Sequence, residues 1–254
     1  MSTTNNKVAI ITGATGGIGF EVAKRLGQDG FTVIVNGRKQ DKGDEAVAEL
    51  KSAGVDAHYH NFDVTDESAV TKHIKAIGEK FGKIDVLVNN AGGLGGRMRF
   101  EEMTTEFYRK VLALNLDSVF FASRAAIPYL KKGDHPTIIN VTSNAAWNAG
   151  GPGAGMYGTS KAGVQTITRA LAKDLAEYGI RVNAVSPGTI DTPFHQQIKS
   201  TKPEVFQSWA NNIMLGRLGQ PEDVSGVVSF LASKDAAFMT AETVQIGGGQ
   251  ALGI

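Results

Sequence analysis

Near the start of the chain, a short apolar run leads directly into a glycine-rich turn and then into a helical pattern. Residues 8–11 are VAII, residues 12–19 are TGATGGIG, and the apolar spacing of a helix continues through Val22 and Leu26. Glycines in such a turn allow a tight bend and a close approach of the backbone to a ligand. Amides at the N-terminus of the helix can hold a phosphate, although a turn that only connects strand to helix is the alternative. This arrangement favours an α/β fold that binds a ligand at the end of its first strand.

Apolar runs continue to alternate with helical patterns along the rest of the chain. Strands are expected near residues 8–11, 31–35, 56–62, 84–88, 138–141, 180–185 and 243–246, with helices between them. This alternation predicts a Rossmann-type α/β fold with a doubly wound, mainly parallel sheet. No linker, repeat or change of composition divides the 254 residues, so residues 1–254 are expected to form a single domain.

Composition excludes several classes of site and partner. The chain has no cysteine, which excludes disulfides and thiol catalysis, and its net charge of +1 indicates no nucleic-acid partner. His58 and His60 share a strand face, but no third ligand stands near them, so no metal site is expected. The first residues lack the apolar core of a signal peptide, and no run approaches the roughly 20 apolar residues that span a bilayer. We therefore expect a soluble, cytoplasmic protein with no membrane partner.

A tyrosine and a lysine four positions apart carry the clearest chemistry. Tyr157 and Lys161 would share one face of a helix, one turn apart. An ammonium near a phenol favours the phenolate, so we expect Lys161 to lower the pKa of Tyr157 from about 10 and to make it a usable proton donor. Ser143 follows a predicted strand, at the edge where open α/β sheets bind ligands, and its hydroxyl could hold a substrate oxygen. Taken alone, the Tyr–Lys pair could also be an ordinary half-exposed helix face.

The residues after the second predicted strand bear on the choice of nucleotide. An acidic side chain there would bind an adenosine ribose, whereas an arginine would bind a 2′-phosphate. Residues 36–39 contain Arg38 and no acid, which favours NADP over NAD. A solvated loop cation is the alternative, since surface arginine is common.

A polar segment of irregular pattern at about residues 189–215 follows the sixth predicted strand. It carries Phe194, Phe206, Trp209 and Met214 and is expected to be a mobile lid over the substrate. These aromatic and apolar residues indicate either an apolar part of the substrate or simple packing of the lid itself.

The order of these motifs resembles the short-chain dehydrogenase/reductase family, in its single-domain form of about 250 residues. The resemblance covers essentially the whole chain. The matching parts are the glycine turn at 12–19, Asp63-Val64, NNAG at 89–92, Asn115, Ser143, Tyr157, Lys161, and PGTIDTP at 187–193. Residues 215–224, LGRLGQPEDV, resemble the 3-oxoacyl-[acyl-carrier-protein] reductase branch, which does not name the substrate.

The resemblance implies hydride transfer between NADP(H), or NAD(H), and a carbonyl or secondary alcohol substrate. It implies Tyr157 as proton donor, Ser143 as the residue that fixes the carbonyl, and Lys161 as the cation that holds the ribose. Asn115 would anchor a water, although a simple buried amide is the alternative. The implied cofactor-binding residues are Gly13, Thr15, Gly17, Ile18, Gly19, Arg38, Asp63, Val64, Asn89, Ala91, Gly92, Tyr157, Lys161, Pro187, Gly188, Thr189, Ile190 and Thr192.

Two wider expectations also come from the resemblance. The chain would assemble as a homotetramer through the long helices near 105–130 and 156–178 and through the C-terminal strand region. A catalytically silent NADP-binding regulatory protein is the alternative function, but such a protein would be expected to lose Tyr157 or Lys161. One departure affects the cofactor: Gly16 stands where many NADP-binding members carry a basic residue, so Arg38 would select NADP largely alone.

Overall fold

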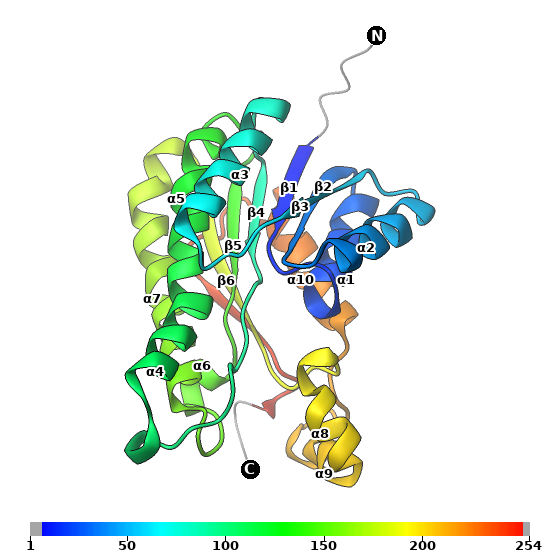
Figure 1. Ribbon diagram of the computed structural model, residues 1–254. Helices are drawn as coiled ribbons and strands as arrows, with labels where there is room; N and C mark the ends of the chain where they lie inside the picture. The colour runs from blue at the N-terminus through cyan, green and yellow to red at the C-terminus, as the bar shows by residue number, and fades with distance from the viewer. Residues whose placement is uncertain (1–6, 251–254) are drawn as a thin grey trace.

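Parallel strands form the centre of the computed structural model, which describes residues 7–250 (Figure 1). Within those residues, one seven-stranded sheet has the order β3-β2-β1-β4-β5-β6-β7. The strands are β1 (Lys7–Ile11), β2 (Phe31–Gly37), β3 (Ala57–Asn61), β4 (Val86–Asn89), β5 (Thr137–Val141), β6 (Arg181–Pro187) and β7 (Thr243–Ile246). Every neighbouring pair is parallel, so the predicted doubly wound α/β fold is confirmed.

Helices connect the strands and cover both faces of the sheet. The α-helices are α1 (Gly17–Gln28), α2 (Gln40–Ser52), α3 (Glu67–Phe81), α4 (Thr105–Leu112), α5 (Ser118–Leu130), α6 (Ala145–Asn148), α7 (Gly155–Leu175), α8 (Gln196–Thr201), α9 (Pro203–Ser208) and α10 (Pro221–Ala232). The shorter turns are η1 (Phe100–Glu102), the π-helical η2 (Ala113–Asp117), η3 (Ala176–Tyr178), η4 (Pro193–His195), η5 (Trp209–Asn212) and η6 (Lys234–Ala236). Helices α1, α2 and α10 pack on one face, and α3, α5 and α7 pack on the other (Figure 1).

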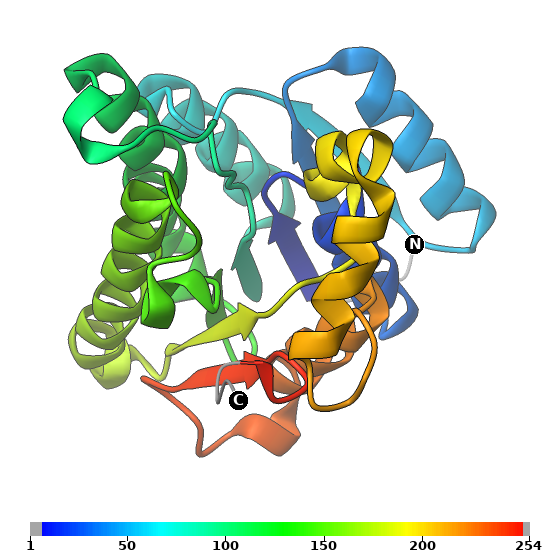
Figure 2. The same cartoon turned by 90° about the horizontal axis from the view of Figure 1, so that it is seen from below.

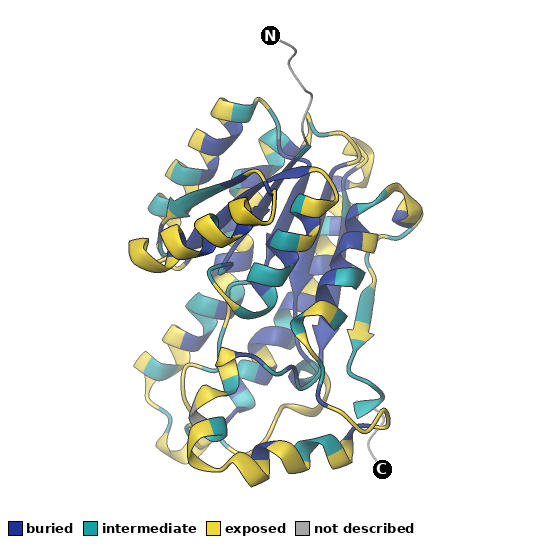
Figure 3. Cartoon of the chain, turned by 90° about the vertical axis from the view of Figure 1, so that its right-hand side faces the viewer, coloured by how far each residue is buried: buried dark blue, intermediate teal, exposed yellow. Residues whose placement is uncertain are grey.

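The inner strands β1, β2, β4, β5 and β6 are largely apolar because both faces of the sheet are buried there. In β1, Ala9 and Ile11 belong to the core under α1 and α10, while Val8 and Ile10 belong to the core under α3 and α5. Figure 3 shows the sheet as the buried centre of the molecule. A sheet covered on both faces removes the alternation of apolar and polar residues that marks a half-exposed strand.

Buried amides fix the middle strands to each other. Asn89 in β4 donates to Asn140 in β5 at 2.8 Å, and Asn140 donates to Thr168 in α7 at 2.9 Å. Such a network is specific because each buried polar group needs its partner. It aligns the ends of β4 and β5 with the helix that carries Tyr157 and Lys161.

The longest apolar helix lies against the sheet. Thr105–Leu130 is a continuous 26-residue helix through α4, η2 and α5, and by length and composition alone it could cross a membrane. Charged residues interrupt its apolar sequence, so no unbroken apolar run of about 20 residues marks it. Its inner face, which includes Ala122, Ala126 and Leu130, is buried in the core with α3. That packing is the arrangement of a core helix.

The segment expected to be irregular contains four short helical pieces, η4, α8, α9 and η5. Helices of six residues or fewer are too short to give a readable apolar period. The segment has a small core of its own, formed by Phe206, Ile213 and Leu218 with Trp209 packed against it. Figures 1 and 2 show α8 and α9 at the end of the sheet where the strands terminate.

Candidate active site

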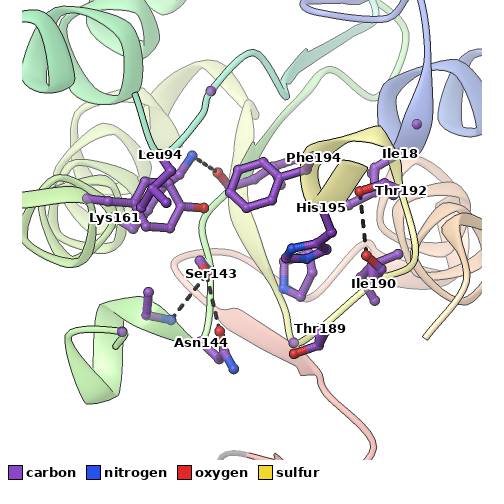
Figure 4. Close-up of a pocket in the computed structure, with 18 of the residues that line it drawn as sticks. Ile18, Leu94, Ser143, Asn144, Lys161, Thr189, Ile190, Thr192, Phe194 and His195 are labelled. Atoms are coloured by element: carbon purple, nitrogen blue, oxygen red, sulfur yellow. Dashed lines mark hydrogen bonds between the residues drawn. The ribbon is translucent and has the colours of Figure 1, made fainter. Parts of the chain in front are cut away.

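A cavity of about 1250 Å³ opens at the carboxyl ends of the strands. This is the edge at which open α/β sheets bind ligands, beside the point where the strand order reverses between β1 and β4. Of the residues predicted from the sequence, those that line the cavity are Gly13, Thr15, Gly17, Ile18, Gly19, Arg38, Gly92, Ser143, Tyr157, Lys161, Pro187, Gly188, Thr189, Ile190 and Thr192. Side chains from loops far apart in the sequence converge on it (Figure 4).

Five predicted residues lie behind the wall of the cavity. Asp63 pairs with Arg38 at 3.7 Å, and Val64 is buried in the core under α3. Asn89 points into the sheet, and Ala91 contributes its backbone, which donates to the hydroxyl of Thr12 at 3.0 Å. The fifth, Asn115, is described below. These positions support the walls of the pocket.

The glycine-rich turn has the shape of a phosphate cradle. Gly13 and Gly17 adopt positive φ angles of 62° and 57°, where a side chain would strain the backbone. A Cβ on Gly19 would lie 2.4 Å from the side-chain nitrogen Nδ2 of Asn90. Helix α1 can therefore pack this closely against the loop after β4 only with glycine at position 19. Gly16, the N-cap of α1, has no side chain to cap the helix, which leaves the first amides of α1 for a ligand.

Two cations stand at the adenosine end of this cradle. Arg38 follows β2, and Lys42 lies one turn later on α2; both line the cavity. The Arg38 side chain is 72% exposed, and Lys42 pairs with Glu45 at 2.7 Å. Lys42, which the sequence motifs did not indicate, thus lines the same cavity as Arg38. A cofactor bearing a 2′-phosphate fits this charge.

Ser143, Tyr157 and Lys161 lie on one wall of the cavity. The Lys161 ammonium donates to the carbonyl of Val141 at 2.8 Å and lies 5.8 Å from the centre of the Tyr157 ring. Helix α7 packs closely against α6 because Gly158 has no side chain. A Cβ on Gly158 would lie 2.8 Å from the carbonyl oxygen of Ala145, the first residue of α6. Figure 4 shows Lys161 and Ser143 among the side chains that line the pocket.

Burial controls the protonation of this pair. Burial raises the pKa of Tyr157, and a hydrogen bond with Ser143 opposes that rise. Burial lowers the pKa of Lys161 to about 8. The expectation that Lys161 lowers the Tyr157 pKa is wrong for this arrangement, because the ammonium is directed at the Val141 carbonyl and desolvation of the phenol dominates.

Asn115 holds the loop after β4 to the π-helical turn. Its amide nitrogen donates to the carbonyls of Gly93 at 2.8 Å and Val111 at 2.9 Å, and its oxygen accepts from the Gly93 amide at 2.9 Å. That oxygen and the Lys161 ammonium both lie 2.9 Å from where a Cβ on Gly92 would stand. Gly92 therefore leaves a small space between Asn115 and Lys161.

Gln250 reaches the pocket from the other end of the chain, and no motif in the sequence singles it out. Its side-chain oxygen accepts from the Thr189 amide at 2.9 Å and from Asn144 at 3.2 Å. It thereby joins the ends of β5 and β6. The other lining residues that the motifs did not indicate include Leu94, Arg97, His195 and Asn212.

The part of the chain that the structure describes contains no group of three or more His, Asp or Glu residues arranged to hold a metal ion. His60 and His73 form a close pair, with 3.3 Å between their Nδ1 atoms. Neither lies in the cavity.

A Rossmann-type sheet with a glycine cradle and a Ser–Tyr–Lys wall defines the class of nucleotide-dependent oxidoreductases. A family model described as enoyl-(acyl carrier protein) reductase matches residues 13–251. The diacetyl reductase [(S)-acetoin forming] of Staphylococcus aureus is 39% identical over 97% of this chain and 98% of its own length. The human dehydrogenase/reductase SDR family member 4 is 37% identical over 96% of this chain and 87% of its own length. The chain belongs to the short-chain dehydrogenase/reductase family.

Solved structures agree with this assignment. A crystal structure of a variant of the actinorhodin polyketide ketoreductase with NADPH superposes with a TM-score of 0.92. It is 34% identical in sequence, and the match covers 99% of both chains. The likeness therefore extends over the sheet, the cavity and the segment that carries α8 and α9.

Proposed function

We propose that this chain reduces the carbonyl group of a small molecule to a secondary alcohol with NADPH, and oxidises the alcohol in reverse. One observation carries the proposal: Ser143, Tyr157 and Lys161 lie in the same cavity as the glycine cradle and its two cations. The names of the relatives support it, since one reduces diacetyl and the actinorhodin ketoreductase structure contains NADPH.

The cofactor fits the cavity through backbone shape and positive charge. The residues that would hold it are Gly13, Thr15, Gly17, Ile18, Gly19, Arg38, Lys42, Gly92, Tyr157, Lys161, Pro187, Gly188, Thr189, Ile190 and Thr192. Arg38 and Lys42 would bind the 2′-phosphate, which distinguishes NADPH from NADH. When bound, the nicotinamide supplies the hydride.

The side chains of the wall position the carbonyl and supply the proton. Tyr157 donates its hydroxyl proton to the carbonyl oxygen as that oxygen becomes an alkoxide. The Ser143 hydroxyl hydrogen-bonds the same oxygen, so the growing negative charge is always partnered. Lys161 keeps a positive charge beside the site, and Asn115 fixes the loop and leaves the space near Gly92 in which a water could link Lys161 to solvent.

The segment at about 189–215 would act as a lid over the substrate. Phe194 is 49% exposed and lies 6.2 Å from the Tyr157 ring, centre to centre. Phe206 is buried in the core of the segment and so serves packing. Phe194 would thus contact an apolar part of the substrate, whereas Phe206 would pack the lid.

The chain would assemble as a homotetramer in the cytoplasm. The exposed side chains Tyr108 and Phe120 lie on the helix Thr105–Leu130, and Phe238, which is fully exposed, lies shortly before the edge strand β7. Exposed apolar groups of this size suit contacts between subunits. Ala172 faces the core, whereas Ala170 is exposed and could allow close approach of α7 helices.

A panel of ketones with NADPH tests the proposed function. Absorbance of NADPH should fall with at least one small diketone, oxo ester or oxo acid, and NADH should support a slower rate. If NADPH binds, as measured by calorimetry, but no carbonyl compound consumes it, the chain is a binding protein and the proposal is wrong. Light scattering on the same sample tests the tetramer, which a monomer at micromolar concentration would contradict.

A further inference from the structure

The charges that line the cavity are unbalanced. Four cations line it, Arg38, Lys42, Arg97 and Lys161, and none of its described lining residues is Asp or Glu. The whole chain has a net charge of only +1, so this excess is local to the cavity. A wall with positive charge and no carboxylate attracts anions.

The proposed cofactor accounts for three of these cations. Arg38 and Lys42 stand beside the glycine cradle, and Lys161 stands beside Tyr157. Arg97 belongs to the loop that follows β4, and it contacts the loop that leads into α7. Among the cations of the described residues that line the cavity, Arg97 is the one to which the proposed cofactor gives no role.

Arg97 is an exposed residue whose side chain bonds to the backbone of the neighbouring loop. Its guanidinium donates to the carbonyl of Pro152 at 3.0 Å, and the Met98 amide beside it donates to the Gly153 carbonyl at 3.0 Å. A Cβ on Gly151 would lie 3.4 Å from the guanidinium, and one on Gly153 would lie 3.1 Å from the Arg97 Cβ. The two glycine-rich loops therefore close around this arginine.

The remaining donors of Arg97 have no acidic partner. Among the described residues, no carboxylate lies within ion-pair distance of its guanidinium. An arginine presents five N–H donors in a planar fork that matches a carboxylate. One bond to Pro152 leaves most of that fork for a ligand.

Arg97 lines the same cavity as Tyr157 and the lid residue His195. The pKa of His195 is lowered by burial, raised by Asp191, and lowered by Lys199 and by Arg97, so the Arg97 charge is close enough to act on this lid residue. His195 stacks edge-on against Phe194 at 4.9 Å, and Phe194 lies 6.2 Å from Tyr157. These lid residues therefore link the surroundings of Arg97 to those of the proton donor Tyr157.

We propose that Arg97 binds a carboxylate of the substrate, and that the preferred substrates are oxo acids with the carboxylate a few bonds from the reacting carbonyl. This inference rests on the proposed function and narrows its substrate class. The chemical step is the same as in the proposed reduction: the carbonyl carbon gains a hydride from NADPH, and the carbonyl oxygen gains the proton of Tyr157. A carboxylate suits the planar fork of the Arg97 guanidinium, which can bind both of its oxygens.

Matched pairs of substrates and variants test this inference. The substrates are acetoacetate with its methyl ester and pyruvate with its methyl ester, each with NADPH. The variants are Arg97→Gln, Arg97→Lys and, as control, Arg99→Gln, a cation of the same loop that does not line the cavity. We expect kcat/KM of the wild type to be higher for the acid than for the ester in at least one pair. Arg97→Gln should lower kcat/KM for that acid by about tenfold or more, since a charged hydrogen bond is lost.

The ester rates, the NADPH dissociation constant and the control variants separate substrate binding by Arg97 from a structural role. The ester rates and the NADPH dissociation constant should change less than about twofold in Arg97→Gln, Arg97→Lys should recover part of the loss, and Arg99→Gln should resemble the wild type. Equal loss for acid and ester would show a structural role and overturn the inference. A wild type that reduces the esters or acetoacetyl-CoA in preference to both acids would also overturn it and leave the proposed reductase function intact. Failure to reduce any carbonyl compound would instead reject the proposed function.

Discussion

The ammonium of Lys161 is bound to the carbonyl of Val141 at 2.8 Å, which ties the catalytic helix to the last residue of β5. Ser143 follows that strand by two residues, so this one bond fixes Ser143 and Tyr157 relative to each other. The lysine thus has a structural contact in addition to its charge. Because it is 3% exposed, its charge is held in a site from which water is largely excluded.

Removal of the Tyr157 hydroxyl should abolish turnover and leave the fold unchanged. Tyr157→Phe keeps the ring that contacts Phe194 and loses the proton donor, so we expect kcat to fall by at least about 100-fold. The NADPH dissociation constant should change by less than about threefold. Tyr178→Phe is the control, since Tyr178 is exposed on η3, away from the cavity. Near-normal turnover of Tyr157→Phe would show that another group donates the proton.

Loss of the cation at Arg38 should weaken NADPH binding selectively. A charged hydrogen bond to the 2′-phosphate contributes about 1.5–3 kcal/mol, so Arg38→Gln should raise the NADPH dissociation constant by about 10- to 100-fold. The NADH constant should stay within about twofold. Lys39→Gln removes a neighbouring charge that does not line the cavity and should have little effect. If both cofactors weaken equally, Arg38 has no part in the choice between them.

Asn115 should contribute to stability through the loop that it holds. Asn115→Ala removes three hydrogen bonds and leaves both polar groups of Gly93 without that partner, so we expect a loss of about 2 kcal/mol in the free energy of unfolding. Urea denaturation measures it. Asn61→Ala, at an exposed strand end, should change it by less than about 0.5 kcal/mol. Equal stability of the two variants would mean that the Gly93 loop finds other partners.

The sheet could be predicted because its determinants are local. Apart from β3, each strand carries β-branched residues that mark it in the sequence, and the glycine turn after β1 specifies its own connection to α1. The short helices α8 and α9 could not be predicted because six residues hold too few turns to show a period. Their packing depends on Phe206 and Ile213, which meet only in the folded chain.

The same division applies to the site. Ser143, Tyr157 and Lys161 follow from motifs, and the cavity brings them together. Gln250 and Arg97 reach the cavity through contacts with Thr189 and Pro152, which are 61 and 55 residues away, and no sequence pattern records such contacts. The direction of the Tyr157 pKa shift also required the structure, because burial cannot be read from the spacing of Tyr157 and Lys161.

The stability of the protein should depend on pH through Lys161. Its pKa is lowered from 10.5 to about 8 by burial, so the folded chain disfavours the charged amine. Below about pH 8 the amine is protonated in both states, and the folded state bears the full cost. Between about pH 8 and 10.5 the unfolded chain keeps a proton that the folded chain releases, so stability rises with pH across this window. A shift of this size corresponds to about 3 kcal/mol.

Substitution of the amine isolates this effect. Lys161→Met should be more stable than the wild type near pH 7, by an amount reduced by the loss of the Val141 bond, and the difference should shrink as pH rises from 8 to 10. Urea unfolding of both proteins at each pH gives the comparison, and tyrosine ionisation near pH 10 affects both. Lys173 is an exposed lysine on the same helix, so the free energy of unfolding of Lys173→Met should change with pH in the same way as that of the wild type. If the free energies of unfolding of the wild type and Lys161→Met keep a constant difference from pH 7 to 10, the folded chain holds Lys161 charged throughout, and burial does not lower its pKa.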